Sequence, residues 1–168
     1  ESLYDVTTQR PGYLAARKRI STKGIAGSDT LAVAFVLRTI ELNKPIAIEN
    51  IYFDYDRWDI RPDAAVELDK LVDIIKDNPD LSFELGSHTD SRGGDMYNLV
   101  LSDGRANSTV DYLIRHGADP ARIIAKGYGE ERLANRCTNG IACSEEAHQA
   151  NRRTEFTITF AKELAGTP

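Results

Sequence analysis

A carboxylate and a guanidinium, Asp90 and Arg105, lie fifteen positions apart around a predicted helix start. If Asp90 ends a strand and Arg105 lies a few turns into the next helix, both charges face one crevice, because helical side chains lean toward the N-terminus. Asn98 shares the helix side of Arg105, since residues seven apart lie nearly above one another. Asp90 can bind an ammonium group, Arg105 can bind a carboxylate through two parallel hydrogen bonds, and an amide can donate and accept. Together these side chains fit an α-amino-acid group, which carries one charge of each sign.

The same spacing also fits a plain Asp90–Arg105 salt bridge that orders the loop. Ion pairs between a loop and the following helix are common and are weak signs of function. From the spacing alone, both interpretations stay open.

Catalysis finds little support in the sequence, which contains no Gly-x-Ser-x-Gly elbow, His-x-x-x-His pair or Gly-x-x-x-x-Gly-Lys loop. His88 and Asp90 would point to opposite faces of a continuing strand, which is poor geometry for an acid–base pair. His88 is expected to be a hydrogen-bonded packing residue. We therefore predict a binding protein without a cofactor, and not an enzyme.

Composition restricts the partners of this chain. Its 168 residues, 41% of them hydrophobic, suffice for one ordinary domain plus an appendage. The net charge of −5 and the scattered Lys and Arg residues argue against nucleic-acid binding. The longest strongly apolar stretch, Thr30 to Leu37, is too short to span a bilayer, so this segment is not expected to cross a membrane. The chain begins with Glu1 and not Met, so we expect a mature or excised piece.

The two cysteines, Cys137 and Cys143, flank a turn-prone loop and are expected to form a small disulfide. Closing so short a loop contributes about 2 kcal/mol. A disulfide also implies an oxidising compartment. The alternative is a zinc site that adds His148, but structural zinc needs four ligands, and the remaining histidines lie in other elements. The sequence favours the disulfide.

Residues 1–48 are predicted to be a β-type arm or the tail of an upstream β module. Turn-prone segments surround one alternating strand at 31–37, and Pro45 marks the junction. Residues 49–162 are predicted to form the main domain, and residues 163–168 a tail.

The main domain shows the element order β-α-β-α-β-β. Strands are predicted at 51–53, 81–85, 122–126 and 154–160, and helices at 61–78 and 95–116, with Asp95 as the N-cap of the second helix and a capped helical turn at 144–147. Two helices on one face of a small mixed sheet make an α/β (α+β) two-layer sandwich.

Six motifs occur in order along the main domain: Tyr52-Phe53-Asp54-Tyr55-Asp56, Arg61-Pro62, His88-Thr89-Asp90-x-x-Gly93, Tyr97-Asn98-x-x-Leu101-Ser102-x-x-Arg105-Ala106, Gly127-Tyr128-Gly129-Glu130 and Asn151-Arg152-Arg153. In these motifs the chain resembles the OmpA-like C-terminal domain, a periplasmic peptidoglycan-binding family, over about residues 48–161. The resemblance implies a β/α sandwich that binds the meso-diaminopimelate of the peptide stem. It implies that Asp90 and Arg105 hold the free amino-acid end of that residue, and that the same pocket is lined by Asp56, Asn98, Leu101 and Arg152.

Three positions depart from the family pattern: Ser87, Gly104 and Arg92. Arg92 either crowds the pocket or adds a second cation beside the ligand, so we include it among the ligand-binding residues. The cysteine loop resembles a subgroup found in large multidomain envelope proteins.

The resemblance implies a periplasmic location in a Gram-negative bacterium, in a protein associated with the outer membrane and tethered to the cell wall. The alternative is a degenerate domain that keeps the fold and acts as a protein-interaction or oligomerisation module. Assembly into a homo-oligomer is left open.

Overall fold

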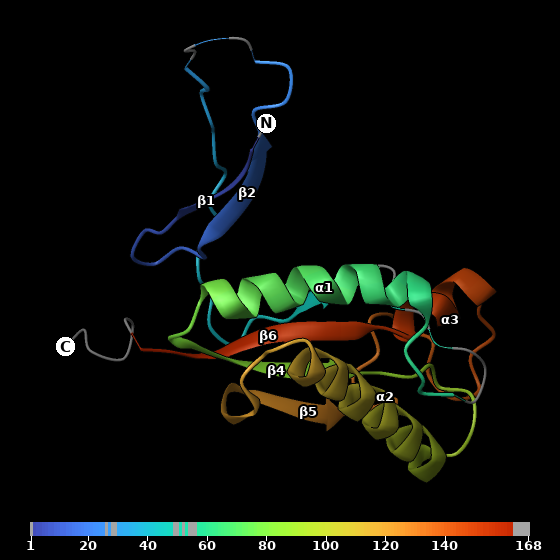
Figure 1. Ribbon diagram of the computed structural model, residues 1–168. Helices are drawn as coiled ribbons and strands as arrows, with labels where there is room; N and C mark the ends of the chain where they lie inside the picture. Colours follow the sequence, from blue (N-terminus) through green and yellow to red (C-terminus); the bar gives the residue numbers. More distant parts are fainter. Residues whose placement is uncertain are drawn as a thin grey trace.

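The computed structural model describes residues 2–25, 27, 30–48, 51, 53 and 57–162 (Figure 1). Two strands, β1 (Leu3–Thr8) and β2 (Ala16–Ser21), form an antiparallel hairpin that projects from an α/β body. The body contains, in order, β3 (Ile46–Ile48), α1 (Pro62–Asp77), β4 (Leu81–Ser87), α2 (Asp95–Arg115), the 3-10 turn η1 (Pro120–Arg122), β5 (Ile123–Gly127), α3 (Glu145–Asn151) and β6 (Thr154–Ala161). None of the helices in these described ranges is long and apolar enough to cross a membrane.

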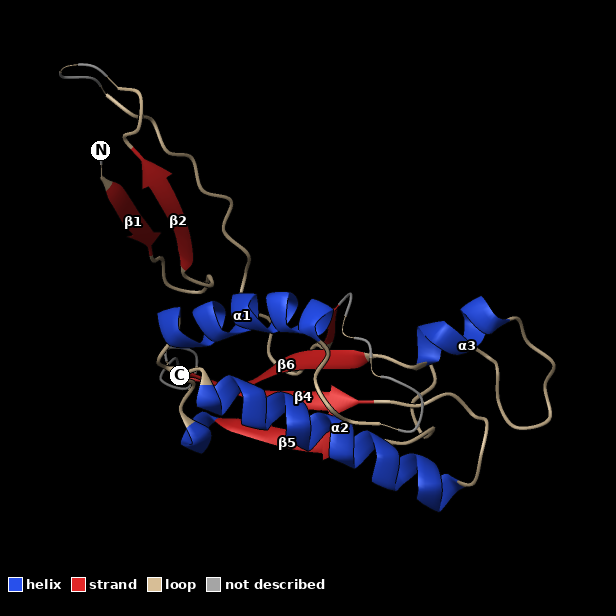
Figure 2. Cartoon of the chain, turned by 45° about the vertical axis from the view of Figure 1, so that its right-hand side comes forward, coloured by secondary structure: helices blue, strands red, loops and turns tan. Residues whose placement is uncertain are grey.

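The body is built on a mixed sheet with the strand order β3-β6-β4-β5. β4 pairs in parallel with β5 and antiparallel with β6, and β3 pairs antiparallel with β6. α1 and α2 lie on the same face of this sheet (Figure 2). The predicted two-layer α/β sandwich with a mixed sheet is confirmed, and the predicted helical turn before the last strand is α3.

The core lies between the sheet and the two helices, and it follows the periodicities of the sequence. Phe83 and Leu85 of β4 are buried, whereas Ser82 and Glu84 point to the other face and are half-buried. Phe83 stacks on Phe156 of β6 with a centroid distance of 4.8 Å. α1 adds a buried stripe formed by Ala64, Leu68, Leu71, Val72 and Ile75. Fully burying one large apolar side chain of this kind contributes about 1.5–3 kcal/mol, so these contacts stabilise the sandwich.

The end of β5 lies close against α2, and the turn after β5 holds the loop that follows β4. A Cβ atom at Gly127 would lie 2.3 Å from the backbone nitrogen of Asp103, so this approach requires glycine. Gly129 donates its backbone N–H to Ser102 Oγ at 2.8 Å and accepts the Thr89 N–H at 2.9 Å. These contacts tie the loop after β4 to the side of α2.

The strand predicted at 31–37 is wrong, because this segment lies outside any strand. Val33, Phe35 and Leu37 are half-buried and their neighbours are exposed, so the alternation does describe which side chains face inward. Lys18 of β2 reaches the segment through its side chain and donates to the Ala34 carbonyl. A strand requires a ladder of backbone hydrogen bonds, and alternation does not reveal whether a neighbour supplies one.

The hairpin strands themselves are not predicted, because their residues are mostly polar. Asp5 and Arg19 are direct cross-strand partners and form an ion pair with an N–O distance of 2.9 Å. Opposite charges at matching positions of two short segments are the signal that identifies such a hairpin.

Two element boundaries differ from prediction. The first strand of the body lies at Ile46–Ile48, where it pairs with 154–156 of β6, and not at 51–53. Ile51 and Phe53 lie outside any strand, although Ile51 is buried in the core, and Tyr52 lies outside the described residues. The N-cap of α2 is Gly94, and Asp95 is the first helical residue, where its carboxylate still interacts favourably with the helix dipole.

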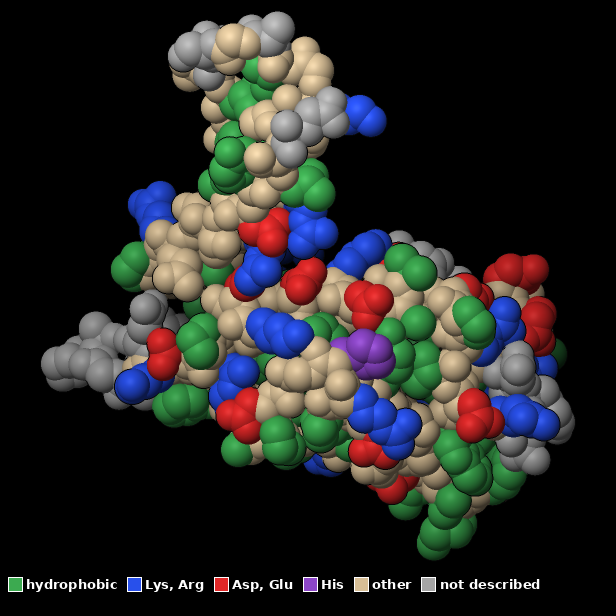
Figure 3. Space-filling view, viewed as in Figure 1, with side chains coloured by type: hydrophobic (Ala, Val, Ile, Leu, Met, Phe, Trp, Pro, Cys, Tyr) green, Lys and Arg blue, Asp and Glu red, His purple; other side chains and the backbone are tan. Residues whose placement is uncertain are grey.

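The hairpin contacts the body at the C-terminal end of α1. The Ala15 N–H donates to Asn78 Oδ1 at 2.9 Å, Arg17 forms an ion pair with Asp77, and Leu14 joins the core. Charged side chains of both signs gather where the hairpin meets the body (Figure 3).

The predicted division between residues 48 and 49 stays a prediction, although β3, which precedes it, pairs with β6. The predicted tail at 163–168 lies outside the described residues.

Candidate ligand-binding site

A pocket of about 680 Å³ lies at the end of β4, lined by the loop after this strand, the first half of α2 and the start of α3. Six of the seven residues that the sequence predicts to bind ligand line it: Asp90, Arg92, Asn98, Leu101, Arg105 and Arg152. The seventh, Asp56, lies outside the described residues. The remaining lining residues are Phe53, Thr89, Gly93, Tyr97, Glu145 and Gln149. The fold therefore brings the predicted residues together, and their role in binding stays a prediction.

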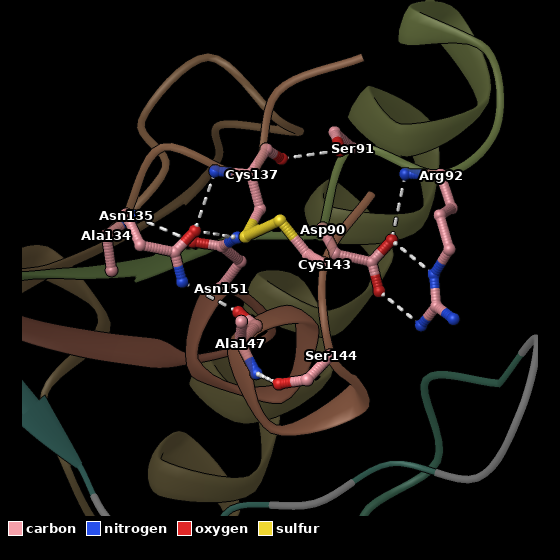
Figure 4. The surroundings of a disulfide bond; sticks show 10 residues. All are labelled: Asp90, Ser91, Arg92, Ala134, Asn135, Cys137, Cys143, Ser144, Ala147 and Asn151. Atoms are coloured by element: carbon pink, nitrogen blue, oxygen red, sulfur yellow. Dashed lines mark hydrogen bonds and ion pairs between the residues drawn. A yellow bond between two sulfur atoms is a disulfide. The ribbon is translucent and has the colours of Figure 1, made fainter. Parts of the chain in front are cut away.

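The carboxylate of Asp90 is heavily hydrogen-bonded in this pocket. Its side chain is 7% exposed, and its carboxylate accepts the backbone N–H and the guanidinium of Arg92 as well as Arg152 Nη1. Figure 4 shows the Arg92 guanidinium facing the Asp90 carboxylate. Burial alone raises the pKa of Asp90, but hydrogen bonds from Arg92 and Arg152 outweigh it and lower the pKa to about 2. Asp90 is therefore a carboxylate at neutral pH.

Arg105 lies in the same pocket but does not pair with Asp90. Its Nε donates to the Arg57 carbonyl at 3.1 Å, and its guanidinium lies 5.0 Å from the centre of the Phe53 ring. Within the described residues, the carboxylate of Asp90 pairs with Arg92 and Arg152, so the plain Asp90–Arg105 salt bridge is not formed. The two charges are separate features of one pocket, as a zwitterionic ligand requires.

Asn98 connects the loops around the pocket. Its Nδ2 donates to the backbone carbonyls of Asp90 and Arg92, both at 3.3 Å, and to Glu130 Oε2 at 2.5 Å. The other oxygen of Glu130 accepts Asn139 Nδ2 at 2.6 Å. Asn98 therefore holds the loop that carries Asp90 in place, which is a positioning role as well as a lining role.

The disulfide between Cys137 and Cys143 is present, which confirms the predicted pairing (Figure 4). The bond occupies both sulfurs, so the alternative zinc site is excluded. Ser91, the neighbour of Asp90, donates its hydroxyl to the Cys137 carbonyl at 2.6 Å. Ser144, directly after Cys143, caps α3 by accepting the Ala147 N–H at 3.3 Å. The disulfide loop thus contacts the Asp90 loop at one end and precedes α3 at the other.

A sequence model described as the OmpA family matches residues 52–146, which is more than half of the chain. The chain belongs to the OmpA family. Outer membrane porin F of Pseudomonas fluorescens is 34% identical over 110 residues, which cover 65% of this chain and 32% of that protein. The peptidoglycan-associated lipoprotein of Pseudomonas putida is 35% identical over 110 residues, which cover 66% of this chain and 63% of that protein.

A solved structure also resembles this OmpA-family chain. The crystal structure of the peptidoglycan-associated lipoprotein from Burkholderia pseudomallei superposes with a TM-score of 0.57 at 25% identity, covering 64% of this chain and 87% of that chain. The chain spans about a third of the porin and less than two thirds of the Pseudomonas putida lipoprotein. The similarity therefore describes a shared domain and not a whole protein.

Glu145 also lines the pocket, although the sequence of 144–147 predicts only a capped turn. Its carboxylate accepts Arg92 Nη1 at 2.9 Å, Arg92 Nη2 at 3.3 Å and Arg152 Nη2 at 2.6 Å. Hydrogen bonds from these two arginines lower the pKa of Glu145. Glu145 lies just before the end of the family match at residue 146, and Arg152 lies beyond it. In the sequence, Glu145 can be recognised as the acidic residue that follows Cys143 and the N-cap residue Ser144.

His88 is buried behind the pocket, as expected for a packing residue. Its Nε2 lies 3.2 Å from Glu155 Oε2, and its ring stacks on Tyr128 with a centroid distance of 5.1 Å. Burial, together with the nearby Arg153, lowers the pKa of His88 to about 4, so the imidazole is neutral at pH 7. Asn151, the first residue of the Asn151-Arg152-Arg153 motif, is buried at the end of α3.

Gly104, which departs from the family pattern, lies against an aromatic ring. A Cβ atom at this position would lie 3.1 Å from ring atoms of Trp58. A glycine costs about 1 kcal/mol relative to alanine inside a helix. A side chain at this position would therefore crowd Trp58, in the helix turn directly before Arg105.

Proposed function

We propose that this OmpA-family domain binds peptidoglycan non-covalently through the meso-diaminopimelate of the peptide stem, and holds an outer-membrane protein to the cell wall. The observation that carries the proposal is one pocket lined by two nearly buried side chains of opposite charge, Asp90 and Arg105. The free end of diaminopimelate has an ammonium and a carboxylate on one carbon, so each ligand charge meets an opposite charge. The names of the relatives, an outer membrane porin and a peptidoglycan-associated lipoprotein, support a place in the Gram-negative envelope, facing the periplasm.

In this proposal Arg105 binds the ligand carboxylate and Asp90 binds the ammonium. The Arg57 carbonyl and the Phe53 ring hold Arg105, so little side-chain freedom is lost when a ligand binds. Leu101 lines the same pocket and offers apolar contact to the methylene chain between the two ends of diaminopimelate. Each contact therefore matches one chemical part of the ligand.

Replacing Arg105 with alanine tests the carboxylate contact. The Arg105→Ala variant should lose about 2–5 kcal/mol of affinity for purified sacculi, because the ligand carboxylate is then buried without a partner. Arg115→Ala, the same substitution at the exposed end of the same helix, is the matched control and should bind as wild type does. An Arg105→Ala protein with a wild-type circular dichroism spectrum and wild-type sacculus binding contradicts the proposal.

The same contact is tested from the ligand side, without any change in the protein. Amidation of the free diaminopimelate carboxylate removes half of the Arg105 partner, so the amidated stem peptide should bind the wild-type domain more weakly. Equal affinity for the two peptides argues against the assignment. The proposal also makes the domain non-catalytic, so muropeptides incubated with it should yield no new products.

One observation favours the alternative of a protein-interaction or oligomerisation module. The Arg92 guanidinium already forms an ion pair with the Asp90 carboxylate, which the ligand ammonium would need. A titration with a diaminopimelate stem peptide, followed by NMR, separates the two functions. Peptidoglycan binding predicts saturable shifts at the loop of Asp90 and at Arg105, whereas the alternative predicts none.

A further inference from the structure

The Asp90 carboxylate accepts hydrogen bonds from four donors of this chain. Oδ1 accepts the Arg92 backbone N–H at 2.9 Å and Arg92 Nε at 3.2 Å. Oδ2 accepts Arg92 Nη2 at 2.8 Å and Arg152 Nη1 at 2.5 Å. An ionised carboxylate has about four lone-pair sites. A ligand ammonium can therefore bind Asp90 only in place of one of these donors.

The side chain of Arg92 is the donor best placed to leave. It is 53% exposed, whereas the side chain of Arg152 is 25% exposed and also donates to Gln149 and to Glu145 Oε1. A second carboxylate, Glu145, already accepts two Arg92 donors at 2.9 and 3.3 Å. When Arg92 leaves Asp90 it therefore keeps a charged partner, and the backbone N–H of Arg92 stays on Oδ1.

We infer that Arg92 is a specificity-determining residue of this pocket, an internal competitor that a ligand ammonium displaces from Asp90 onto Glu145. The inference rests on the proposed function and extends it to the class of stem peptide. A lone amine, such as the lysine side chain of a lysine-type stem peptide, would replace the bidentate Arg92 guanidinium on Asp90 with a single ammonium. Its positive charge would then lie in a pocket that already contains Arg92, Arg105 and Arg152. A zwitterionic end brings a carboxylate as well, which binds Arg105 and offsets the charge of the displaced guanidinium. Arg92 therefore selects diaminopimelate-type stems over lysine-type stems.

The test measures the affinity of the 168-residue chain for two synthetic stem peptides, one with diaminopimelate and one with lysine at the same position. Arg92→Ala removes the competitor, so both peptides should bind more tightly, the lysine peptide by about tenfold and the diaminopimelate peptide by about threefold. Glu145→Gln removes the carboxylate that receives Arg92, so the diaminopimelate peptide should bind about threefold more weakly. In the double variant, the effect of Glu145→Gln should shrink to the part that comes from the Glu145–Arg152 contact, because no Arg92 side chain remains to be received. Arg115→Ala is the control that should change neither affinity.

The outcomes separate this inference from the proposed function. If wild type binds the diaminopimelate peptide but Arg92→Ala leaves the ratio of the two affinities unchanged, or weakens both, the inference is overturned and the proposed function stands. If Arg92→Ala binds a peptide that wild type does not, the competitor role is supported most directly. If neither protein binds either peptide or purified sacculi, the proposed function fails and the inference fails with it.

Discussion

In both β4 and the segment 31–37, every second residue is a large apolar one, yet only β4 is a strand. β4 lies between β5 and β6, and its alternate side chains are buried in the core. The segment 31–37 has no strand neighbour among the described residues, and Val36 within it is 91% exposed. Alternation determines which side chains face together, whereas hydrogen-bonded neighbours determine whether a strand forms. Substitutions in the two regions should therefore lower the free energy of unfolding by very different amounts.

The largest effect is expected in β4. Phe83 is fully buried and stacks on Phe156, so Phe83→Ala should lower the free energy of unfolding by about 3–5 kcal/mol. Urea unfolding followed by circular dichroism measures this loss. Phe83→Leu keeps most of the volume and should lose less. A loss below about 1 kcal/mol for Phe83→Ala would show that β4 is not a central core strand.

The next effect concerns pH and the buried imidazole that follows β4. Burial and Arg153 lower the pKa of His88 to about 4 in the folded protein, compared with about 6.5 in an unfolded chain. The folded state therefore binds fewer protons than the unfolded state between these values, so stability is complete above pH 6.5 and falls as the pH falls toward 4. The expected loss is about 3 kcal/mol, measured by urea unfolding at several pH values.

Two histidine variants separate this effect from general acid sensitivity. His88→Asn should flatten the dependence between pH 6.5 and 4, whereas His116→Gln, at an exposed position after α2, should keep it. Asp90 acts in a lower window, because its pKa of about 2 removes stability only as the pH falls below about 4. An unchanged profile in His88→Asn would assign the effect to another group.

A smaller effect is expected from the loop that the disulfide closes. Replacing both Cys137 and Cys143 with serine should lower the free energy of unfolding by about 2 kcal/mol, because the unfolded chain regains the freedom of the open loop. Affinity for a stem peptide should also fall, since Ser91 and α3 are attached to this loop. Calorimetric melting and peptide titration of the same protein measure both effects. Wild type treated with a reductant should match the double variant, and equal melting temperatures with and without the disulfide would refute the prediction.

The smallest effect is expected in the segment 31–37. Val36→Ser removes an exposed side chain and should change the free energy of unfolding by less than about 0.5 kcal/mol. The measurement is the same urea unfolding used for Phe83→Ala. A loss above about 1 kcal/mol would mean that Val36 is packed in solution, and the contrast between the two regions would then be smaller than the structure indicates.

The sequence predicts the body of the molecule well, because helix stripes and strand alternation report directly on burial. The stripe of α1 and the alternation of β4 each produce the element and face that the pattern indicates. The motifs also bring Asp90, Asn98 and Arg105 to one pocket, since strand ends and helix faces are local geometry.

The sequence does not predict the partners of Asp90, because these depend on loops. Arg92 lies two residues away and turns back on the carboxylate, and Glu145 arrives from beyond the disulfide loop. Which ion pairs form at this site depends on how the loop of 137–143 positions α3 against the loop after β4. No periodicity carries that information, so the spacing alone leaves the plain Asp90–Arg105 pair open as an interpretation.

The hairpin and the pocket lie at opposite ends of the sheet (Figure 1): the hairpin contacts Asn78 just before β4, and the pocket includes Asp90 just after it. From the hairpin the chain enters the sheet through β3, which runs parallel to β4 because both pair antiparallel with β6. Under the proposed function, a pull between the hairpin and a pocket bound to the cell wall therefore acts along the strands. It loads the backbone hydrogen bonds of β3 and β6 together, in shear, instead of opening them one after another. We expect a domain attached in this way to resist mechanical force better than one pulled from a single end of its sheet.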